Sequence, residues 1–193
     1  VVTPAIHQRI MKEVIEPTVA GMAAEGNDYT GFLYAGLMIN AAGEPKVIEY
    51  NCRFGDPETQ PIMMRLQGDL IAMCNSALDG TLNEMSVQWD PRPSVGIVLA
   101  AGGYPESYDK GDVISGLDHC DTHDAKVFHA GTKIEHSEVV TNGGRVLCAT
   151  ALGDNVTDAQ QKAYAQVDAI SWNGMYFRKD IAYRAIAREK SAT

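Results

Sequence analysis

The sequence predicts an α+β fold, in which helices surround an antiparallel hairpin and a smaller mixed α/β region follows. The first observation is a pair of apolar stretches, residues 30–39 and 46–53, separated by a polar turn, which is typical of a β-hairpin. The second is a series of short strand-like stretches in the second half of the chain, followed by helical ones. The proline-rich segment 90–93 forms a stiff connector between the two patterns. We therefore expect two domains, residues 1–89 and 90–193.

A helix is predicted at the start of the chain. Thr3 is suited to cap it, and Pro4 is suited to its first position. Pro17 should kink or restart the helix, because proline lacks the backbone N–H that an inner turn uses. Gly26 marks its C-terminal end. The apolar residues that recur at helical spacing are Ile6, Ile10, Val14 and Ile15.

The hairpin and two further helices complete the predicted first domain. Gly36 weakens the first strand of the hairpin, so it indicates a close approach of another group to the backbone. A short helix is expected over residues 61–66. A longer helix is expected over residues 69–78, because Asp69 is a suitable cap and Gly80 a suitable stop.

The second half is predicted to be rich in strands and to end in two helices. Asn142-Gly143-Gly144 is a strong hairpin signal, so the stretches on either side of it are expected to be connected by a tight turn. The predicted strands are residues 94–101, 113–117, 126–134, 138–141 and 145–152, and the predicted helices are residues 157–170 and 181–187.

The composition is that of an ordinary soluble globular protein, with 45% hydrophobic and 21% charged residues. No apolar run is long enough to cross a bilayer. The net charge of −9 argues against a nucleic-acid partner, because phosphates attract basic surfaces. No signal peptide is apparent and the chain opens without methionine, so we expect it to begin inside a longer polypeptide.

The four cysteines indicate a reducing compartment. They are widely spaced and form no CxxC pair, which fits reduced thiols in a cytosolic protein. The segment 119–123 contains two histidines and a cysteine at a spacing that zinc accepts. It lies between predicted strands without a second ligand cluster, so an exposed loop is the favoured interpretation.

The candidate site is a row of polar side chains on the second strand of the hairpin. Because side chains alternate along a strand, Glu49, Asn51 and Arg53 are expected to share one face. A carboxylate and an amide oxygen are ligands that Mg²⁺ accepts, and a guanidinium beside them can hold a phosphate or a carboxylate. The row therefore suits phosphoryl transfer, and the alternative is a half-buried strand whose polar face meets water. The residues expected to face a core instead are Ile48, Tyr50 and Cys52.

A charged turn follows this strand. Asp56-Pro57 favours a sharp turn, which would bring Glu58 back toward the strand end. Two carboxylates and an arginine in so short a stretch need partners, which are one another, a cation or a ligand. The turn therefore favours a binding site over a plain solvated strand. Near the other end of the chain, Arg178 and Lys179 form a charged step whose role is left open between a solvated face and a contact with the first domain.

The stretch Glu49–Gln60 closely resembles the signature of the phosphoribosylamine–glycine ligase family, which are ATP-grasp enzymes of purine synthesis. The similarity extends over essentially the whole chain. It implies a fold that combines part of an ATP-grasp core, an antiparallel sheet with helices, with a small mixed α/β C-terminal domain. The other segments that resemble this family are residues 30–37, 101–105, 128–132 and 141–147.

The resemblance implies an activity and a role for each residue of the site. The reaction is the ATP-dependent ligation of glycine to 5-phosphoribosylamine through a glycyl phosphate, giving glycinamide ribonucleotide, ADP and phosphate. By position, Glu49 and Asn51 would bind the Mg²⁺ or Mn²⁺ that bridges the ATP phosphates. Arg53 would neutralise charge on the transferring phosphoryl group or on the glycine carboxylate. Asp56 and Glu58 would shape the pocket for glycine and the amine, and the enzyme would be cytoplasmic.

Two departures from the wider pattern carry expectations of their own. Many ATP-grasp proteins have a further metal-binding carboxylate on the preceding strand, at the position that Leu37 occupies here. Glu49 and Asn51 are therefore expected to be the main protein ligands. A full member of the family also carries an N-terminal domain and a glycine-rich, lysine-bearing lobe over the nucleotide, and neither precedes Val1. The chain is therefore expected to be inactive by itself.

Two other functions are alternatives. A biotin carboxylase-like ATP-grasp ligase also places Glu, Asn and Arg at alternate strand positions, but the Gly-Asp-Pro-Glu loop after Arg53 favours the glycine ligase. The second alternative is a non-catalytic module that binds a nucleotide or a partner chain. Titration of the chain with Mg²⁺ and ATP tests this second alternative.

Overall fold

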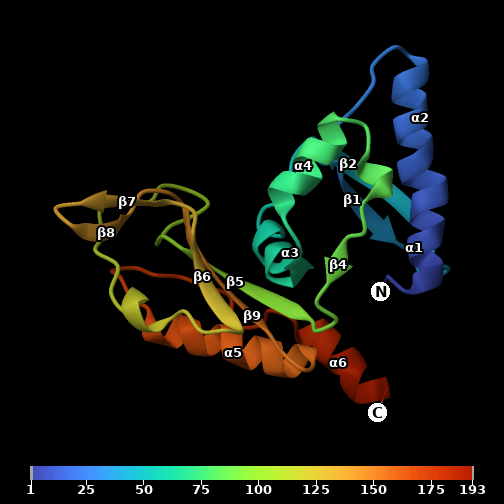
Figure 1. The fold of residues 1–193 in the computed structure, drawn as a ribbon. Helices are drawn as coiled ribbons and strands as arrows, with labels where there is room; N and C mark the ends of the chain where they lie inside the picture. The colour runs from blue at the N-terminus through green and yellow to red at the C-terminus, as the bar shows by residue number, and fades with distance from the viewer. Residues whose placement is uncertain (1, 193) are drawn as a thin grey trace. The chain divides into compact units, whose positions relative to one another are not determined.

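The computed structural model describes residues 2–192, which form two compact units (Figure 1). The first unit comprises the chain up to residue 56 and residues 69–86. The second comprises residues 57–68 and the chain from residue 87 onward. Both units combine helices with antiparallel strands, so the predicted α+β class is confirmed. Within the described residues, no helix has the length and apolar character needed to cross a membrane.

The first unit opens with three helical segments in succession. They are α1 (Pro4–Ile10), a π-helical stretch (Met11–Ile15) and α2 (Glu16–Ala24). Thr3 is the predicted cap, since its hydroxyl oxygen accepts a hydrogen bond from the backbone N–H three residues later at 3.3 Å. Pro17 lies in the first turn of α2, so the helix restarts there as predicted.

The predicted hairpin is confirmed, with shorter strands. β1 (Tyr34–Ile39) pairs antiparallel with β2 (Pro45–Asn51). The register shifts after Gly36, which makes Ile48 the extra residue of a β-bulge on β2. Arg53 lies beyond the end of β2, although the sequence placed it on the strand.

Helix α4 (Leu70–Leu78) is capped as predicted by Asp69, whose Oδ1 accepts from two backbone N–H groups at 2.8 and 3.1 Å. Two apolar residues of this helix, Ile71 and Leu78, are 68% and 78% exposed. These two residues flank the stripe that follows helical spacing and is half-buried. That stripe consists of Leu70, Met73, Cys74 and Ala77.

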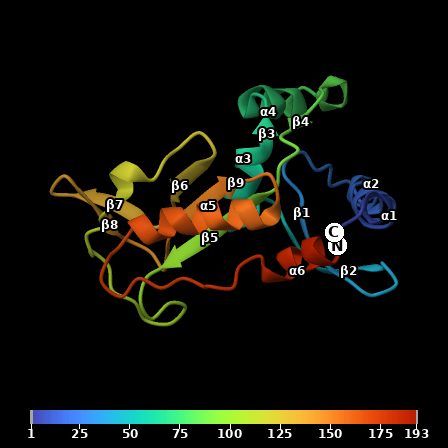
Figure 2. The same cartoon turned by 90° about the horizontal axis from the view of Figure 1, so that it is seen from below.

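The second unit is built on a three-stranded antiparallel sheet in the order β5–β9–β6. β9 (Arg145–Leu152) is the central strand, between β5 (Ser94–Ala100) and β6 (Ala125–His129). α5 (Val156–Ala169) lies across one face of this sheet (Figure 2). Asn155 caps α5, since its Oδ1 accepts from the N–H of residue 158 at 2.9 Å.

The two faces of the sheet are covered by different helices. The face toward α5 holds the core, because burying large apolar side chains away from water is the main favourable term in folding. On the other face, α3 (Thr59–Arg65) packs against β5, and a Cβ built on Gly96 would lie 3.0 Å from Pro61 Cγ. The largest fully buried apolar side chains of this unit include Ile97, Leu99, Val146, Leu147 and Val167.

The predicted turn at residues 142–144 does not form a hairpin. β7 (Thr132–Glu135) pairs with β8 (Glu138–Thr141), whereas the strand after the turn, β9, pairs with β5 and β6. Instead, Gly143 lies where its chain segment crosses closely over the segment that contains Gly131, since a Cβ built on Gly131 would lie 2.8 Å from Gly143 Cα. This crossing also splits the predicted strand 126–134 into β6 and β7.

Several short elements complete the fold. Residues 113–117 form isolated bridges rather than the predicted strand, and a 3₁₀ turn covers Leu117–His119. Another 3₁₀ turn covers Leu82–Glu84. No pattern in the sequence indicated the two-residue ladder between β3 and β4. The remaining elements of the fold are β3 (Leu66–Gln67), β4 (Gln88–Trp89) and α6 (Tyr183–Ala192).

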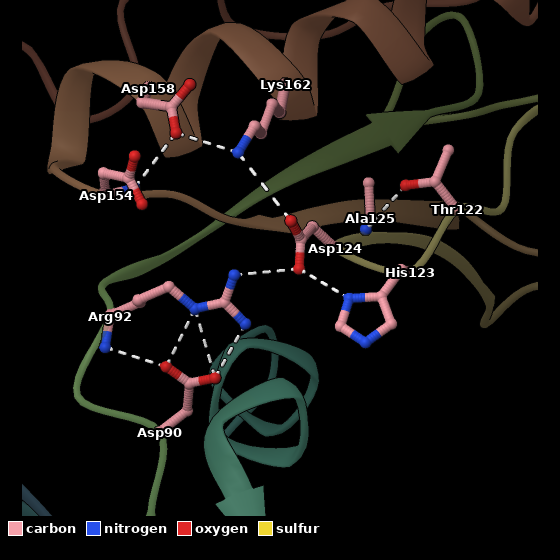
Figure 3. A network of polar contacts seen from close by, with 9 residues as sticks. All are labelled: Asp90, Arg92, Thr122, His123, Asp124, Ala125, Asp154, Asp158 and Lys162. Carbon is pink, nitrogen blue, oxygen red and sulfur yellow. Dashed lines mark hydrogen bonds and ion pairs between the residues drawn. The ribbon is translucent and has the colours of Figure 1, made fainter.

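An ion-pair network joins the connector after β4 to the sheet and to α5 in the second unit (Figure 3). Arg92 donates Nε and a terminal nitrogen to Asp90 at 2.8 to 3.2 Å, and its other terminal nitrogen donates to Asp124 at 2.8 Å. Lys162 on α5 lies 4.0 Å from Asp124, which precedes β6, and 2.8 Å from Asp158, which is also on α5. These bonds fix the course of the connector on the second unit.

Replacing Asp90 by asparagine is expected to lower stability at neutral pH and to flatten its acid dependence. The Arg92 side chain and its backbone N–H lower the pKa of Asp90 from 3.8 to about 2. A carboxyl whose pKa is lowered by folding contributes stability above its unfolded pKa, and this contribution is lost as the pH falls from about 4 to about 2. Thermal unfolding followed by circular dichroism between pH 2 and 7 measures both effects.

The matched control for this change is Asp109→Asn, which removes the same charge from an exposed position outside the network. It should leave both the melting temperature and its pH profile close to those of the parent. Equal melting temperatures for Asp90→Asn and the parent at every pH would show that the network contributes nothing to folding.

Candidate functional site

Glu49 and Asn51 lie on the same face of β2. Their pairing with β1 is regular, with Glu49 opposite Gly36 and Asn51 opposite Tyr34. Side chains two residues apart on a regular strand point the same way. Tyr50, between them, points to the opposite face, where its hydroxyl lies 2.7 Å from the hydroxyl of Thr18 on α2. The carboxylate and the amide oxygen therefore share the face that is turned away from that tyrosine contact.

Gly36 provides the room in which the Glu49 side chain lies. A Cβ built on Gly36 would be 3.0 Å from Glu49 Cγ and 3.7 Å from Glu49 Oε1. Contacts of 3.0 Å are tighter than a Cβ normally makes, so a side chain on Gly36 would push the carboxylate aside. The close approach that the sequence indicated at this glycine is therefore an approach by the candidate metal ligand itself.

Arg53 lies just past the strand and stays beside Asn51. One terminal nitrogen of Arg53 lies 3.4 Å from Asn51 Oδ1, and the other donates to the carbonyl oxygen of Phe54 at 2.7 Å. These bonds use two of the five N–H donors of a guanidinium. The arginine is thus oriented by the strand end and keeps the row of three polar groups together, although only two of them stand on the strand.

An aromatic pair anchors the chain as it leaves the strand. The rings of Phe54 and Phe32 lie 4.0 Å apart between centroids, and the carbonyl of Phe32 accepts a hydrogen bond from the Tyr29 hydroxyl at 2.8 Å. Tyr29 also forms a hydrogen bond with Cys52. The pKa of Tyr29 is raised, with burial as the larger cause and this hydrogen bond as the second. This cluster fixes the start of the charged turn.

The two acids of the charged turn belong to different units. Asp56 closes the first segment of the first unit, and Glu58 is the cap residue of α3 in the second. The backbone carbonyl of Glu58 accepts from the N–H of Ile62 at 3.2 Å, which starts the helix. Glu58 therefore stands at the positive end of α3, where a carboxylate is favoured.

The expectation that Ile48, Tyr50 and Cys52 face a core is wrong. Ile48 is 65% and Tyr50 38% exposed, and Cys52 is exposed as well. The bulge at Ile48 explains part of this result, because a bulged residue leaves the regular alternation of the strand. The hairpin contains two strands, so it covers less apolar surface than a wider sheet would.

The side chain of His119 lies outside the described residues, and the two described ligand candidates of segment 119–123, Cys120 and His123, do not come together. The Cys120 thiol is buried and lies 3.0 Å from the carbonyl oxygen of Gly116, whereas the His123 side chain is 94% exposed and pairs with Asp124. Burial raises the pKa of Cys120, which favours the neutral thiol over the thiolate that metals bind. Across the described residues, no three His, Cys, Asp or Glu side chains gather as a metal-binding cluster.

Replacing Gly36 by leucine is expected to weaken divalent-metal binding by about 10-fold, a typical effect of disturbing groups that position a metal ligand. The leucine would displace Glu49 without removing its carboxylate. Mn²⁺ titration of the chain, followed by electron paramagnetic resonance, measures the change. Met38→Leu is the matched control, because Met38 is on the same strand and is 64% exposed. Equal affinities for the Gly36 variant and the parent would exclude this role of the glycine.

Two family models match the chain, one in each half. Residues 1–59 match the model described as phosphoribosylglycinamide synthetase, ATP-grasp (A) domain. Residues 94–184 match the model described as phosphoribosylglycinamide synthetase, C domain. The first match contains Glu49, Asn51 and Arg53, and the second contains the whole sheet of the second unit.

The chain is similar to curated phosphoribosylamine–glycine ligases from several bacteria. It is 66% identical to the protein of Vibrio cholerae over 191 residues, which are 99% of this chain and 44% of that protein. It is 64% identical to the protein of Yersinia pestis and 62% identical to that of Pseudomonas aeruginosa, with coverage of 98% of this chain in both cases. The chain thus spans less than half the length of these relatives.

A solved structure supports the same relationship. The crystal structure of phosphoribosylamine–glycine ligase from Thermotoga maritima matches with a TM-score of 0.77 and 34% identity, over 93% of this chain and 44% of that one. The crystal structure of Kluyveromyces lactis urea carboxylase matches with a TM-score of 0.52 and 16% identity, over 79% of this chain and 14% of that one, which is a likeness of fold alone. The chain belongs to the phosphoribosylglycinamide synthetase family.

Proposed function

We propose that this chain takes part in the ATP-dependent ligation of glycine to 5-phosphoribosylamine, which gives glycinamide ribonucleotide, ADP and phosphate through a glycyl phosphate. The observation that carries the proposal is the presence of Glu49, Asn51 and Arg53 at one end of a hairpin in a chain of this family. The reaction belongs to purine biosynthesis, and its place would be the cytoplasm.

Glu49 and Asn51 fit a divalent cation. Their donors are a carboxylate and an amide oxygen on one strand face, and both are oxygen ligands of the class that Mg²⁺ and Mn²⁺ take. Glu49 is exposed and Asn51 half-buried, so the pair is open to a nucleotide on that face. A bound cation would supply charge neutralisation for the phosphates of ATP. With Leu37 at the position of the further carboxylate, these two residues would be the main protein ligands.

Arg53 would act on the anions of the reaction. Its bonds to Asn51 and to the Phe54 carbonyl hold the guanidinium in place, which is the requirement for catalysis by positioning. The remaining donors suit a phosphoryl oxygen or the glycine carboxylate. Asp56 and Glu58 would shape the pocket for glycine and the amine, with Glu58 set by its place at the start of α3.

We further propose that residues 1–89 belong to the ATP-grasp domain and residues 90–193 to the C-terminal domain. The two family matches, 1–59 and 94–184, lie on either side of this boundary. The 193 residues alone are proposed to be inactive in ligation, because they correspond to only 44% of the length of a relative that is named phosphoribosylamine–glycine ligase. Their partners would then include the remaining part of the same polypeptide.

The experiment that tests the function is an assay of the complete protein with ATP, glycine and 5-phosphoribosylamine. Glycinamide ribonucleotide and ADP should form in equal amounts, and ADP formation should stop when glycine is omitted. ADP release that is independent of glycine would contradict the proposal. The isolated chain should form no product while still binding Mn²⁺, and product formation by it would contradict the proposed inactivity.

A further inference from the structure

The second unit contains a hollow that no residue of the candidate site explains. Its volume is about 410 Å³, within the range of small-molecule sites, and all its lining residues belong to this unit. Its floor is the face of β5 that is turned away from α5, and aromatic rings and two arginines surround it. The residues that line it and carry the argument are Val98, Tyr104, Tyr176, Arg145, Arg178 and Pro57.

The walls of the hollow are held by backbone contacts. Tyr176 and Ala100 exchange two backbone hydrogen bonds, of 2.8 and 2.9 Å, which hold Tyr176 alongside β5. On the other wall, the ring of Tyr104 lies against Gly144, where a Cβ would overlap the ring. The N–H of Ala101 donates to the carbonyl of Gly144 at 2.8 Å, so the chain segments that carry the two rings are fixed to the sheet.

Two arginines line the rim of the hollow. Arg145 is the first residue of β9, and Arg178 follows the segment that carries Tyr176. The hydroxyl of Tyr164 on α5 donates to the carbonyl oxygen of Arg178 at 2.7 Å, which fixes that backbone. Asp180 accepts from Nε and Nη2 of Arg178, at 2.9 and 2.8 Å, and thereby sets the plane of the guanidinium.

These groups select an anion attached to a compact organic body. A guanidinium binds a phosphate through a planar fork of donors, and the apolar floor favours a non-ionic body beside the charge. Cationic side chains are scarce in this chain, with 16 Lys and Arg against 25 Asp and Glu. Two of these 16 cationic side chains line this one hollow.

One residue that lines this hollow belongs to the charged turn that follows β2 in the sequence. Pro57 lines the hollow and is bonded directly to Asp56, and consecutive Cα atoms are about 3.8 Å apart. In the proposed reaction, ATP and glycine are the reactants assigned to Glu49, Asn51 and Arg53. The remaining reactant carries a sugar phosphate, and its phosphate needs cationic partners of its own.

We infer that Arg145 and Arg178 bind the phosphate of the sugar-phosphate substrate, with the sugar over the apolar floor of the hollow. This inference rests on the proposed function for the identity of the substrate. The binding of a sugar phosphate in the hollow is a property of the second unit itself. Arg178, whose role the sequence left open, thereby belongs to substrate recognition.

The test uses ribose 5-phosphate as the probe, with the parent chain and the variants Arg145→Gln and Arg178→Gln. Nuclear magnetic resonance should show shifts of amides around residues 98, 104 and 176, and each variant should raise the Kd by about 10-fold, the scale of one charge-assisted contact. Ribose without phosphate should bind far more weakly. Inorganic phosphate alone, binding as tightly as ribose 5-phosphate, would show a plain anion site and overturn the assignment to a sugar phosphate.

Steady-state kinetics of the complete protein supply the second readout. Both variants should raise the KM for 5-phosphoribosylamine by about 10-fold and leave the KM for ATP and for glycine unchanged. Arg188→Gln, on α6 and outside the lining of the hollow, is the matched control. An active ligase whose KM for the sugar phosphate is the same in all variants would overturn the inference alone. A complete protein without ligase activity would overturn the proposed function, while the Kd measurements would still decide whether the hollow binds ribose 5-phosphate.

Arg178→Lys separates a folding defect from a binding defect. Lysine keeps the charge but loses the planar fork, so its Kd should lie between those of the parent and the glutamine variant. All variants should melt within a few degrees of the parent. If the lysine and glutamine variants both bound the probe as the parent does, the arginine would have no part in recognition.

Discussion

Replacing Gly116 by alanine is expected to destabilise the second unit by about 3 kcal/mol, because two effects add at this position. The residue has φ of +89°, a conformation that residues with a Cβ adopt only with strain. A Cβ there would also overlap the carbonyl oxygen of Ala169 at the end of α5 and lie 2.9 Å from its carbonyl carbon. Backbone atoms of a packed helix have little freedom to move, so the overlap cannot be relieved locally.

Gly111→Ala provides the matched control for this prediction. Gly111 has φ of +95°, but a Cβ there would meet no atom within 4 Å. Its replacement should therefore show the strain alone, about 1 kcal/mol. Urea unfolding of both variants measures the difference, which reports the collision with α5. Equal losses for the two variants would mean that α5 moves aside without a penalty.

Gly116 also illustrates which parts of the fold are predictable from the sequence. Helix caps and strand periodicity are local signals, and they locate the hairpin, α4 and α5 within a few residues. The 3₁₀ turn after Gly116 depends on a mutual pair of backbone hydrogen bonds between Ser115 and Ser171, of 2.9 and 3.1 Å. Ser115 and Ser171 lie far apart in the sequence, so their contact cannot be read from the residues around either of them. The residues 113–117 by themselves have the pattern of a strand, and the prediction is a strand for that reason.

The glycines of the second unit mislead the prediction for the same reason. Asn142-Gly143-Gly144 carries the local signal of a tight turn, but the actual tight turn is at His136 and Ser137, which have φ of +50° and +68°. The crossing of Gly131 and Gly143 decides the pairing of strands, and this crossing is a tertiary contact. The local turn pattern therefore identifies correctly that glycine is needed at these positions, but it predicts a hairpin turn where the structure has a close crossing of two segments.

The candidate site is easier to predict than its surroundings. Side chains alternate between the two faces of any strand. Once the sequence predicts a strand here, it therefore also places Glu49 and Asn51 on one face, as the structure does. The position of Gly36 beneath Glu49 depends on the register of the hairpin, which the bulge at Ile48 shifts. The hollow of the second unit is not predictable in this way, because its lining comes from segments between residues 57 and 181.

Glu49→Gln is expected to weaken the binding of Mn²⁺ in the presence of ATP by about 100-fold or more. The substitution keeps the size of the side chain and removes the negative charge that a hard divalent cation requires. Loss of an outer partner of a metal ligand already weakens affinity by about 10- to 100-fold, so loss of the charged ligand itself should exceed that range. In the complete protein, the ligation rate should fall by at least the same factor.

The controls for Glu49→Gln are chosen from the same hairpin. Glu44→Gln makes the same chemical change in the turn between β1 and β2, where Glu44 bonds to Asn40 at 2.7 Å, and it should leave Mn²⁺ affinity unchanged. Asn51→Leu should weaken binding and Asn51→Asp should restore it, because aspartate returns an oxygen ligand to the same place. This order of affinities separates ligation of the cation from a general effect of the hairpin charge. Full Mn²⁺ affinity in Glu49→Gln, with normal melting behaviour, would remove the hairpin from metal binding and leave Arg53 as an anion-binding residue without a neighbouring cation.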